Sequence, residues 1–499
     1  MPFDWDNFPN QLYYLGKAPL LRSLTLPLSS SIMSDSDPEP SSAKPRSISG
    51  TENSWCKAAS GGTGITVLSL LFNKHPNFTR LQNALHKLQN SHPILRAKLH
   101  FDALTATFSL LIPHSSSLRL QSLDTQSTAR IIQSQSNVGP TDITPFQILL
   151  EQELNNNPWE NLDRSSETEG IDVLHASVYE IEEGEKWAVM MKLHTGACDR
   201  TAAVAVMKEL MWLMKSGSGS QGVVEEDGEV GLGVEEYIPS GRTTKRFWSR
   251  GVDMLGYSLN SFRLSNLEFV DPSSPRRSRA VRLLLDSDHT TMLLEGCKSR
   301  GIKLCGALSA AALIAARLSK CLPDGEWEKY AVVTLIDCRK LLEPALSSYH
   351  VGFYHSAILN THDMKGGEEL WELARRTYTS FDDAKNSNKH FSDMADLNFL
   401  MCRAIENPGL TPSSSLRTSF ISVFEDPVID ETNENHEELG IEDYMGCAST
   451  HGVGPSIAIF DTVRQGKLDC VCVYPFPLHS REQMQELIDN LKKILIDCL

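Results

Sequence analysis

The chain lacks the sequence signals of a secreted, disulfide-bonded or membrane-spanning protein. Its 11 cysteines include no C-x-x-C pair, and the closest two, Cys470 and Cys472, fall on one face of an expected strand. An odd number of cysteines in a chain of this length favours buried free thiols in a reducing compartment over a disulfide framework. No apolar run reaches the ~18 residues that a membrane span requires. We therefore expect a cytoplasmic protein with no membrane span.

Positive charge is also scarce. Lysine and arginine together number 47 against 63 aspartate and glutamate, which gives a net charge of −16. A broad nucleic-acid surface needs clustered cations, so we expect no nucleic-acid partner. Two local basic clusters are either solvated faces or sites for an anionic small ligand; they are Arg242, Lys245, Arg246 and Arg250, and Arg276, Arg277, Arg279 and Arg282.

The N-terminal region has no convincing signal peptide. Asp4 and Asp6 lie where a signal peptide carries positive charge. Residues 34–54 are rich in serine, proline and aspartate, so residues 1–54 are predicted to be a disordered extension. Met33 opens that stretch. Either residues 1–32 are an upstream extension and Met33 is the working start, or the whole stretch is an unstructured tail.

The length of 499 residues is too great for one simple core, and no repeat is visible. Composition changes once, at a glycine- and serine-rich, acidic stretch that we interpret as a mobile linker loop over 216–245. The linker separates a first lobe, 55–215, from a second lobe, 246–499. Deleting residues 216–241 is expected to leave the fold intact, because they lack apolar periodicity.

Hydrophobic periodicity predicts alternating helices and strands in both lobes. In the first lobe, Asn77 caps a helix that ends before Pro93. Strands are predicted at 94–101, 173–181 and 187–194, and a helix at 201–215. In the second lobe we predict a helix at 305–318, a strand at 330–337, and a hairpin of 457–463 and 467–474. A capping box of Ser480 and Gln483 starts the last helix. This interleaving indicates α/β sandwiches side by side.

The most informative segment runs from Lys192 to Thr201 and reads Lys-Leu-His-Thr-Gly-Ala-Cys-Asp-Arg-Thr. It leaves a strand, turns at Gly196 and enters a helix. The segment resembles the His-His-x-x-x-Asp-Gly signature of condensation domains, alcohol acetyltransferases and related coenzyme-A-dependent acyltransferases. His194 matches the first histidine and Asp199 the aspartate. Thr195 stands where the catalytic second histidine is expected, and Arg200 replaces the final glycine.

Three further segments resemble the same superfamily in the same order. They are residues 88–96 (LQNSHPILR), residues 301–311 (GIKLCGALSAA), and residues 333–344 (VTLIDCRKLLEP) followed by 349–353 (YHVGF). The whole is similar to plant acyltransferase-like relatives. The resemblance implies a two-lobed α/β fold like that of chloramphenicol acetyltransferase, with a channel between the lobes and the 194–199 loop at their junction.

The resemblance also implies a chemistry. In the superfamily the second histidine removes a proton from the acceptor as it attacks a thioester. The aspartate is structural and pairs with an arginine from the other lobe, which Arg339 matches here. The implied function is transfer of an acyl group from acyl-CoA to an alcohol or amine. Small-molecule donor and acceptor are then the partners, acyl-CoA is a co-substrate, no cofactor is tightly bound, and the protein is a monomer.

Thr195 leaves three interpretations open, because its hydroxyl does not deprotonate near neutral pH. In the first, His194 is the base instead. In the second, the activated thioester reacts through positioning alone. In the third, the chain is a catalytically silent protein that binds a ligand or partner on the same scaffold.

Other residues at or near the motif have ordinary interpretations beside the functional ones. His194 on an apolar strand face is either structural or catalytic. Cys198 follows it at a spacing that zinc can use on a helix, but two ligands do not make a site, and the superfamily needs no cysteine nucleophile. His350, His355 and His451 are expected to be surface or interface residues. The glycine-rich stretch 60–64 has no phosphate-loop spacing.

Overall fold

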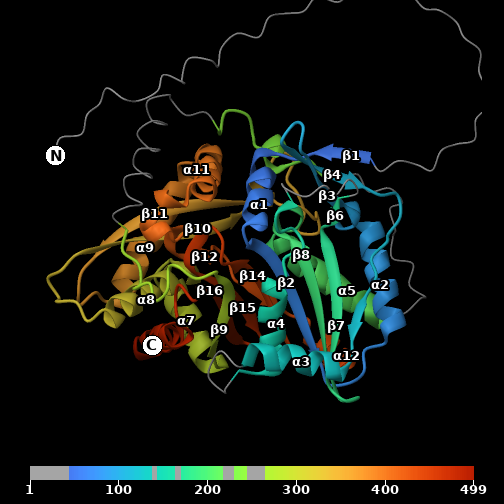
Figure 1. The fold of residues 1–499 in the computed structure, drawn as a ribbon. Coiled ribbons are helices and arrows are strands. Elements are labelled where there is room, and N and C mark those ends of the chain that lie inside the picture. The colour runs from blue at the N-terminus through green and yellow to red at the C-terminus, as the bar shows by residue number, and fades with distance from the viewer. Residues whose placement is uncertain (1–43, 137–142, 163–169, 217–229, 244–263) are drawn as a thin grey trace, which may run out of the picture. The chain divides into compact units, whose positions relative to one another are not determined.

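Three β-sheets with helices packed on them make up the part of the chain that the computed structural model describes, which is residues 44–136, 143–162, 170–216, 230–243 and 264–499 (Figure 1). Ala43–Leu499 form one compact unit. Residues 1–43 of the expected N-terminal extension lie outside the described residues. The two-lobed α/β class that the sequence predicts is confirmed.

A five-stranded sheet organises the first lobe, in the order β14-β2-β8-β7-β5. Its strands are β2 (Thr63–Phe72), β5 (Gln121–Leu123), β7 (Leu174–Glu182), β8 (Lys186–His194) and β14 (Ile441–Thr450). β14 comes from the second half of the sequence and pairs antiparallel with β2, with Tyr444 opposite Leu70. The expected lobe boundaries therefore need correction, because one strand of the first lobe belongs to the 246–499 segment.

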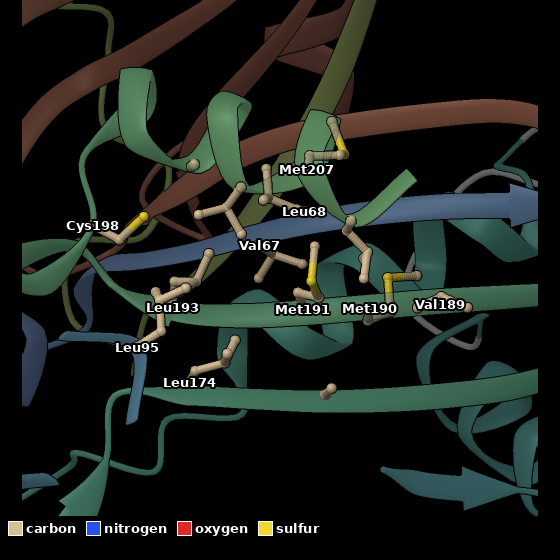
Figure 2. Packing of buried hydrophobic residues seen from close by; sticks show 14 of the residues in the cluster. Val67, Leu68, Leu95, Leu174, Val189, Met190, Met191, Leu193, Cys198 and Met207 are labelled. Atoms are coloured by element: carbon tan, nitrogen blue, oxygen red, sulfur yellow. The ribbon is translucent and has the colours of Figure 1, made fainter. Parts of the chain in front are cut away.

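Both faces of this sheet are covered, since nearly every side chain of β2 and β8 is buried. The helices of this half are α1 (Gly50–Ser60), α2 (Phe78–Ser91), α3 (Thr125–Ser136), α4 (Pro145–Asn155) and α5 (Arg200–Ser216). Figure 2 shows part of the core, which includes Val67 and Leu68 of β2, Leu193 of β8 and Met207 of α5. The expected cap of α2 is present, because Asn77 Oδ1 accepts from Arg80 N at 2.9 Å.

A seven-stranded sheet organises the second lobe, with β13 pairing alongside β15. It contains β9 (Arg277–Leu285), β10 (Glu328–Asp337), β11 (His355–Met364), β12 (Arg417–Phe424), β13 (Val428–Asp430), β15 (Gly454–Arg464) and β16 (Lys467–Phe476). Helices α7 (Ser287–Ser299), α8 (Leu304–Ser319), α9 (Leu370–Asn386) and α13 (Arg481–Asp497) share its core. The small side chains of α8 are almost all buried, which allows the close packing that the sequence indicated. The predicted hairpin is present as β15 and β16.

Smaller elements complete the described structure. A four-stranded sheet combines β1 (Lys44–Ser47), β3 (Lys98–Asp102), β4 (Thr107–Ile112) and β6 (Ile171–Asp172). Helices α10 (Lys389–Ser392), α11 (Met394–Glu406) and α12 (Asn433–Leu439) belong to the second half. The 11 cysteines are free, and Cys470 and Cys472 are buried in β16. In the described residues no single helix is long and apolar enough to span a membrane. The helices α7 and α8 pass the same test of length and composition only when taken as a pair, and that pair is bent by 107°.

The first described elements, β1 and α1, begin before the expected boundary at residue 55. Ser49 caps α1, and Glu52 completes a capping box with it. Arg46 holds Glu52 at 2.9 Å. The Ser49 and Glu52 spacing is a helix-start signal in its own right, which the serine- and proline-rich composition around it concealed.

The expected linker is also more structured than predicted where it is described. Residues 217–229 and 244–245 lie outside the described residues. Between them, Val234 is fully buried in a cluster with residues of the second lobe. Glu235 Oε1 accepts from both the backbone N and Oγ1 of Thr51, each at 2.7 Å. Deletion of the whole 216–241 stretch would remove these contacts, so the prediction that it is dispensable is wrong for its second half.

Two local expectations also differ from the structure. Residues 94–96 belong to a 3-10 helix, η2 (Pro93–Arg96), and the strand starts only at Lys98. Pro93 fixes its own backbone in the helical region, which delays the strand. At α13, Ser480 accepts from Gln483 N at 3.1 Å. The Gln483 side chain instead donates to Glu268 O, so the cap is present without the reciprocal bond of a capping box.

Candidate active site at the lobe junction

A cavity of about 150 Å³ lies between the two large sheets, where the resemblance implied a channel. Strands β2 and β14 and helix α5 supply one side, and β10, β12 and β15 supply the other. Its lining is mainly apolar and includes Trp55, Met207, Met211, Phe353, Phe424 and Phe460. Thr195, Asp199, Arg200 and His355 also line it. The motif loop therefore lies at the wall of an apolar interlobe cavity.

Thr195 faces this cavity from a short 3-10 turn, η4 (Thr195–Ala197), that follows β8. Its Oγ1 lies 2.7 Å from Thr66 Oγ1, so the two hydroxyls share a hydrogen bond. Gly64 on β2 has φ +92°, and an added Cβ would lie 3.3 Å from Thr195 Cβ and 2.9 Å from the Trp55 ring. Glycine at 64 therefore leaves room for Thr195. A threonine here can donate a hydrogen bond but cannot serve as a base near neutral pH.

The contact expected between Asp199 and Arg339 is present. Arg339 Nη2 lies 3.0 Å from Asp199 Oδ2, and both side chains are about 1% exposed. Asp199 precedes α5 and caps it, because Oδ1 accepts from Ala202 N at 2.9 Å. Its Oδ2 accepts from Tyr354 N at 2.7 Å. One carboxylate thus joins the motif loop to the segment that follows Arg339 in the second lobe.

Asp199 is ionised in this environment. Burial opposes its charge, but the Arg339 guanidinium, His355 and the Ala202 N–H outweigh burial and hold the pKa of Asp199 well below its ordinary value. Arg339 has further acceptors in Asp337, at 3.0 Å, and in the carbonyl of His350. The pair is therefore a buried, fully hydrogen-bonded anchor.

His194 does not face the cavity, which argues against the interpretation that it acts as the base. Its Nδ1 accepts from Gly196 N at 3.1 Å, and its ring packs edge-on against Trp159 at 5.0 Å between centroids. Nε2 is buried and has no hydrogen-bond partner in the described part of the chain. Burial lowers the pKa of His194 to about 4. The side chain therefore has a structural place in the first lobe.

Acid should destabilise the fold through His194. Its pKa is about 4 in the folded protein against 6.5 in a model compound, so between these pH values only the unfolded chain takes up the proton. The stabilisation is complete above pH ~6.5 and is lost as pH falls toward ~4, by up to about 3 kcal/mol. His194→Asn keeps an acceptor for Gly196 N without the titration. Denaturant unfolding at about pH 7.5 and about pH 5 should show a smaller loss for this variant; an equal loss would contradict the assignment.

His355 is the site residue that sequence reasoning missed. It was expected at the surface or an interface, but it is 5% exposed at the start of β11. Its Nδ1 lies 3.0 Å from Asp199 Oδ2. The oxygen lies off the direction of the ring N–H, so the contact is mainly electrostatic. The sequence signal was weak: His355 lies just after the 349–353 segment, which resembles the superfamily but was given no contact with Asp199.

Arg200, in place of the signature glycine, reaches across the cavity. Its guanidinium lies 3.9 Å from the centroid of the Phe424 ring. Nη2 lies 2.9 Å from Asp461 Oδ1 on β15, and the Asp461 side chain is 1% exposed. Arg200 therefore links the start of α5 to the second sheet at the cavity wall.

Residues of the second basic cluster are largely occupied by structural contacts. Arg279 pairs with Glu151 at 2.6 Å. Arg282 pairs with Asp443 and Asp469, each at 2.6 Å. Arg276 donates to the Ser415 carbonyl. In the first cluster, Arg242 donates to Asn388, and the other three residues lie outside the described residues. The described arginines do not indicate an anion site.

The metal and nucleophile interpretations of Cys198 gain no support from its position. Its side chain is fully buried in the first-lobe core (Figure 2). Burial, opposed only in part by Arg339, raises the pKa of its thiol far above the ordinary value. Among the described residues no group of three or more His, Cys, Asp or Glu side chains could hold a metal ion.

The two remaining histidines have structural contacts. His350 stacks edge-on with Tyr354 at 5.4 Å and supplies its carbonyl to Arg339. His451 Nδ1 lies 3.0 Å from Ser278 Oγ, and burial lowers the pKa of His451 to about 4. Neither residue is among those that line the apolar cavity in the described structure.

Solved structures share this architecture. TRI3 trichothecene 15-O-acetyltransferase from Fusarium sporotrichioides aligns with a TM-score of 0.64 at 12% identity, over 91% of this chain and 94% of the other. The EpoB cyclization-docking bidomain from Sorangium cellulosum gives 0.63 at 14%, over 90% and 85%. Polyketide synthase associated protein 5 from Mycobacterium tuberculosis gives 0.57 at 14%, over 90% and 96%. The chain has the condensation-domain and acyltransferase fold.

Comparisons of the sequence with family models and with curated proteins give less information than the solved structures. The family model of the phthiocerol/phthiodiolone dimycocerosyl transferase C-terminus matches residues 274–386. That range holds β9, β10, Arg339 and His355 and is less than half of the chain. No curated protein matches the chain. At this identity the solved structures establish the two-lobed scaffold, and the function has to be argued from the site.

Proposed function

We propose that this protein transfers an acyl group from an acyl-CoA thioester to an alcohol or amine. The observation that carries the proposal is the apolar cavity at the motif loop, lined by Thr195 and Asp199. In this fold that junction is where the resemblance places the reacting thioester. Deeply apolar walls suit a hydrocarbon chain, whose burial contributes about 0.8 kcal/mol per CH₂ group.

The cavity supports a substrate with an acyl chain larger than acetyl. Its apolar walls come from α1, α5 and both large sheets, and Ala448, Ala458 and Gly446 leave space between the larger side chains. The Asp199–Arg339 anchor fixes the loop on which Thr195 lies. A thioester carbonyl held beside that loop is already activated toward a nucleophile, so positioning contributes much of the rate.

A silent acyl-binding protein is the second candidate, and Thr195 is the observation that favours it. Without a histidine at this position the chain loses the base that the superfamily uses, typically a factor of ~10²–10⁴ in rate. The same cavity would hold the acyl group whether the protein transfers it or only binds it. The two candidates therefore differ in turnover and not in ligand affinity.

Thioester turnover distinguishes them. Purified protein is incubated with acetyl-CoA, octanoyl-CoA or palmitoyl-CoA and a panel of alcohols and amines, and free thiol is measured with time. We expect thiol release that depends on the acceptor and is faster with the longer chains. Tight acyl-CoA binding with no acceptor-dependent thiol would support the binding protein and reject transfer.

A cavity-filling variant locates the acyl chain. Ala448→Phe places a ring among the lining residues, and a misplaced chain is expected to cost about 100-fold in turnover of palmitoyl-CoA. Acetyl transfer should be reduced less. Ala103→Phe is the matched control, because Ala103 is exposed in the turn between β3 and β4. Equal palmitoyl turnover in the Ala448→Phe variant and in wild type would place the chain elsewhere.

A further inference from the structure

His355 occupies a position that a general base requires. It lies at the start of β11 in the second lobe, next to Asp199 of the motif loop. Its ring lines the apolar cavity together with Thr195. It also lines a neighbouring cavity, where Asp337, Tyr349 and Asp426 supply polar groups. Of the two cavities, one suits an acyl chain and the other a polar reactant, and the imidazole is common to both.

The Asp199 carboxylate lies beside the Nδ1 edge of the ring. Nδ1 faces the Asp199 carboxylate at 3.0 Å. Asp199 is itself well positioned, because Arg339, Ala202 N and Tyr354 N contact its two oxygens. Nε2 lies on the other side of the imidazole from Nδ1, so the Asp199 contact does not occupy it. No described group hydrogen-bonds to Nε2, so it is free to meet a ligand in the cavities that the ring lines.

Phe353 and Phe424 keep the ring in place from the sides. The His355 ring lies 6.3 Å from Phe353 and 6.1 Å from Phe424, centroid to centroid, and is nearly perpendicular to Phe424. Both phenylalanines line the apolar cavity. A carboxylate behind the imidazole and apolar walls beside it are the supports that a positioned base needs.

We propose that His355 is the general base of this site, in place of the histidine missing at residue 195, and that Asp199 is its positioning residue. This inference rests on the proposed acyl transfer. His355 Nε2 takes the proton of the acceptor hydroxyl or amine while the acceptor oxygen or nitrogen bonds to the thioester carbonyl carbon. The carbon–sulfur bond then breaks, and the imidazolium returns the proton to the leaving thiolate. Atoms and charge balance without any further reactant.

The inference gives Asp199 two tasks. It anchors the motif loop to Arg339, and its negative charge stabilises the imidazolium that forms during transfer. The same charge favours the Nδ1–H tautomer, which leaves the lone pair on Nε2. His194 needs no catalytic part in this arrangement.

His355→Asn is the test variant, because its amide can still reach toward Asp199 while the Nε2 base is gone. We expect turnover to fall by about 10²–10⁴-fold, with little change in acyl-CoA affinity. His362→Asn is the matched control: His362 is buried on the same strand and does not line either cavity in the described structure. His355→Ala is made as a second variant in case the first does not fold, with folding checked by thermal unfolding.

The outcomes separate the inference from the function on which it rests. Active wild type and control with a slow His355→Asn variant support the base. Wild-type turnover that survives both His355 substitutions within a few-fold overturns the inference and leaves acyl transfer standing. Absence of acceptor-dependent turnover in folded wild type overturns acyl transfer, and the base assignment falls with it.

Discussion

Asp199→Ala should lower the free energy of unfolding by about 3–5 kcal/mol, the cost expected when one partner of a buried ion pair is removed. Arg339 would remain about 1% exposed without the carboxylate that lies 3.0 Å away. The variant also loses the side-chain cap of α5, worth roughly 1 kcal/mol, within that total. Denaturant titration of wild type and variant under identical conditions measures the difference.

Two further variants show which interaction accounts for that loss of unfolding free energy. Asp199→Asn keeps an acceptor for the α5 cap and removes only the charge, so it isolates the ion-pair part. Glu406→Gln breaks the exposed pair with Lys57 at 3.0 Å, and such pairs contribute at most about 1 kcal/mol. A loss for Asp199→Ala no larger than for Glu406→Gln would show that the anchor does not hold the lobes in the way the structure indicates.

Thr195→His should restore turnover in a His355→Asn background. His355→Asn removes the base, and Thr195→His puts an imidazole at the position of the superfamily's base, beside the same cavity. The gain should approach about 10²–10⁴-fold over His355→Asn alone. Thr195→Gln, which adds a side chain of similar bulk without a base, should give no gain.

The rescue has one structural condition. The imidazole must take the space beside Thr66 and Gly64, where Thr195 now lies. Thermal unfolding of the double variant shows whether it is accommodated. A folded double variant whose turnover equals that of His355→Asn would contradict the view that the cavity can use a base from either wall.

Periodicity located most of the secondary structure, because long amphipathic and apolar segments are decided locally. The predicted helices at 201–215 and 305–318 correspond to α5 and α8. The predicted hairpin is β15 and β16. Strand β14 was not predicted to join the first sheet, because its pairing with β2 is a tertiary choice that local sequence does not record.

The site residues also divide into those that the sequence predicted and those that only the fold brings together. The Asp199–Arg339 contact followed from the resemblance of two separated segments. The place of His355 did not, since nothing in its neighbours' spacing distinguishes it from His350. Only the fold brings Nδ1 of His355 within 3.0 Å of Asp199. For His194 the sequence predicted too much. Its position in the motif suggested a catalytic role, but its ring packs against Trp159 and does not face the cavity.

The most direct test is the mass of the product. Wild-type protein is incubated with palmitoyl-CoA and each acceptor of the panel, and the acceptor is analysed by mass spectrometry while free thiol is counted. Acyl transfer predicts an acylated acceptor in the same amount as the released thiol, and neither product without protein. Bound palmitoyl-CoA with no acylated acceptor, in protein that is folded, would contradict it.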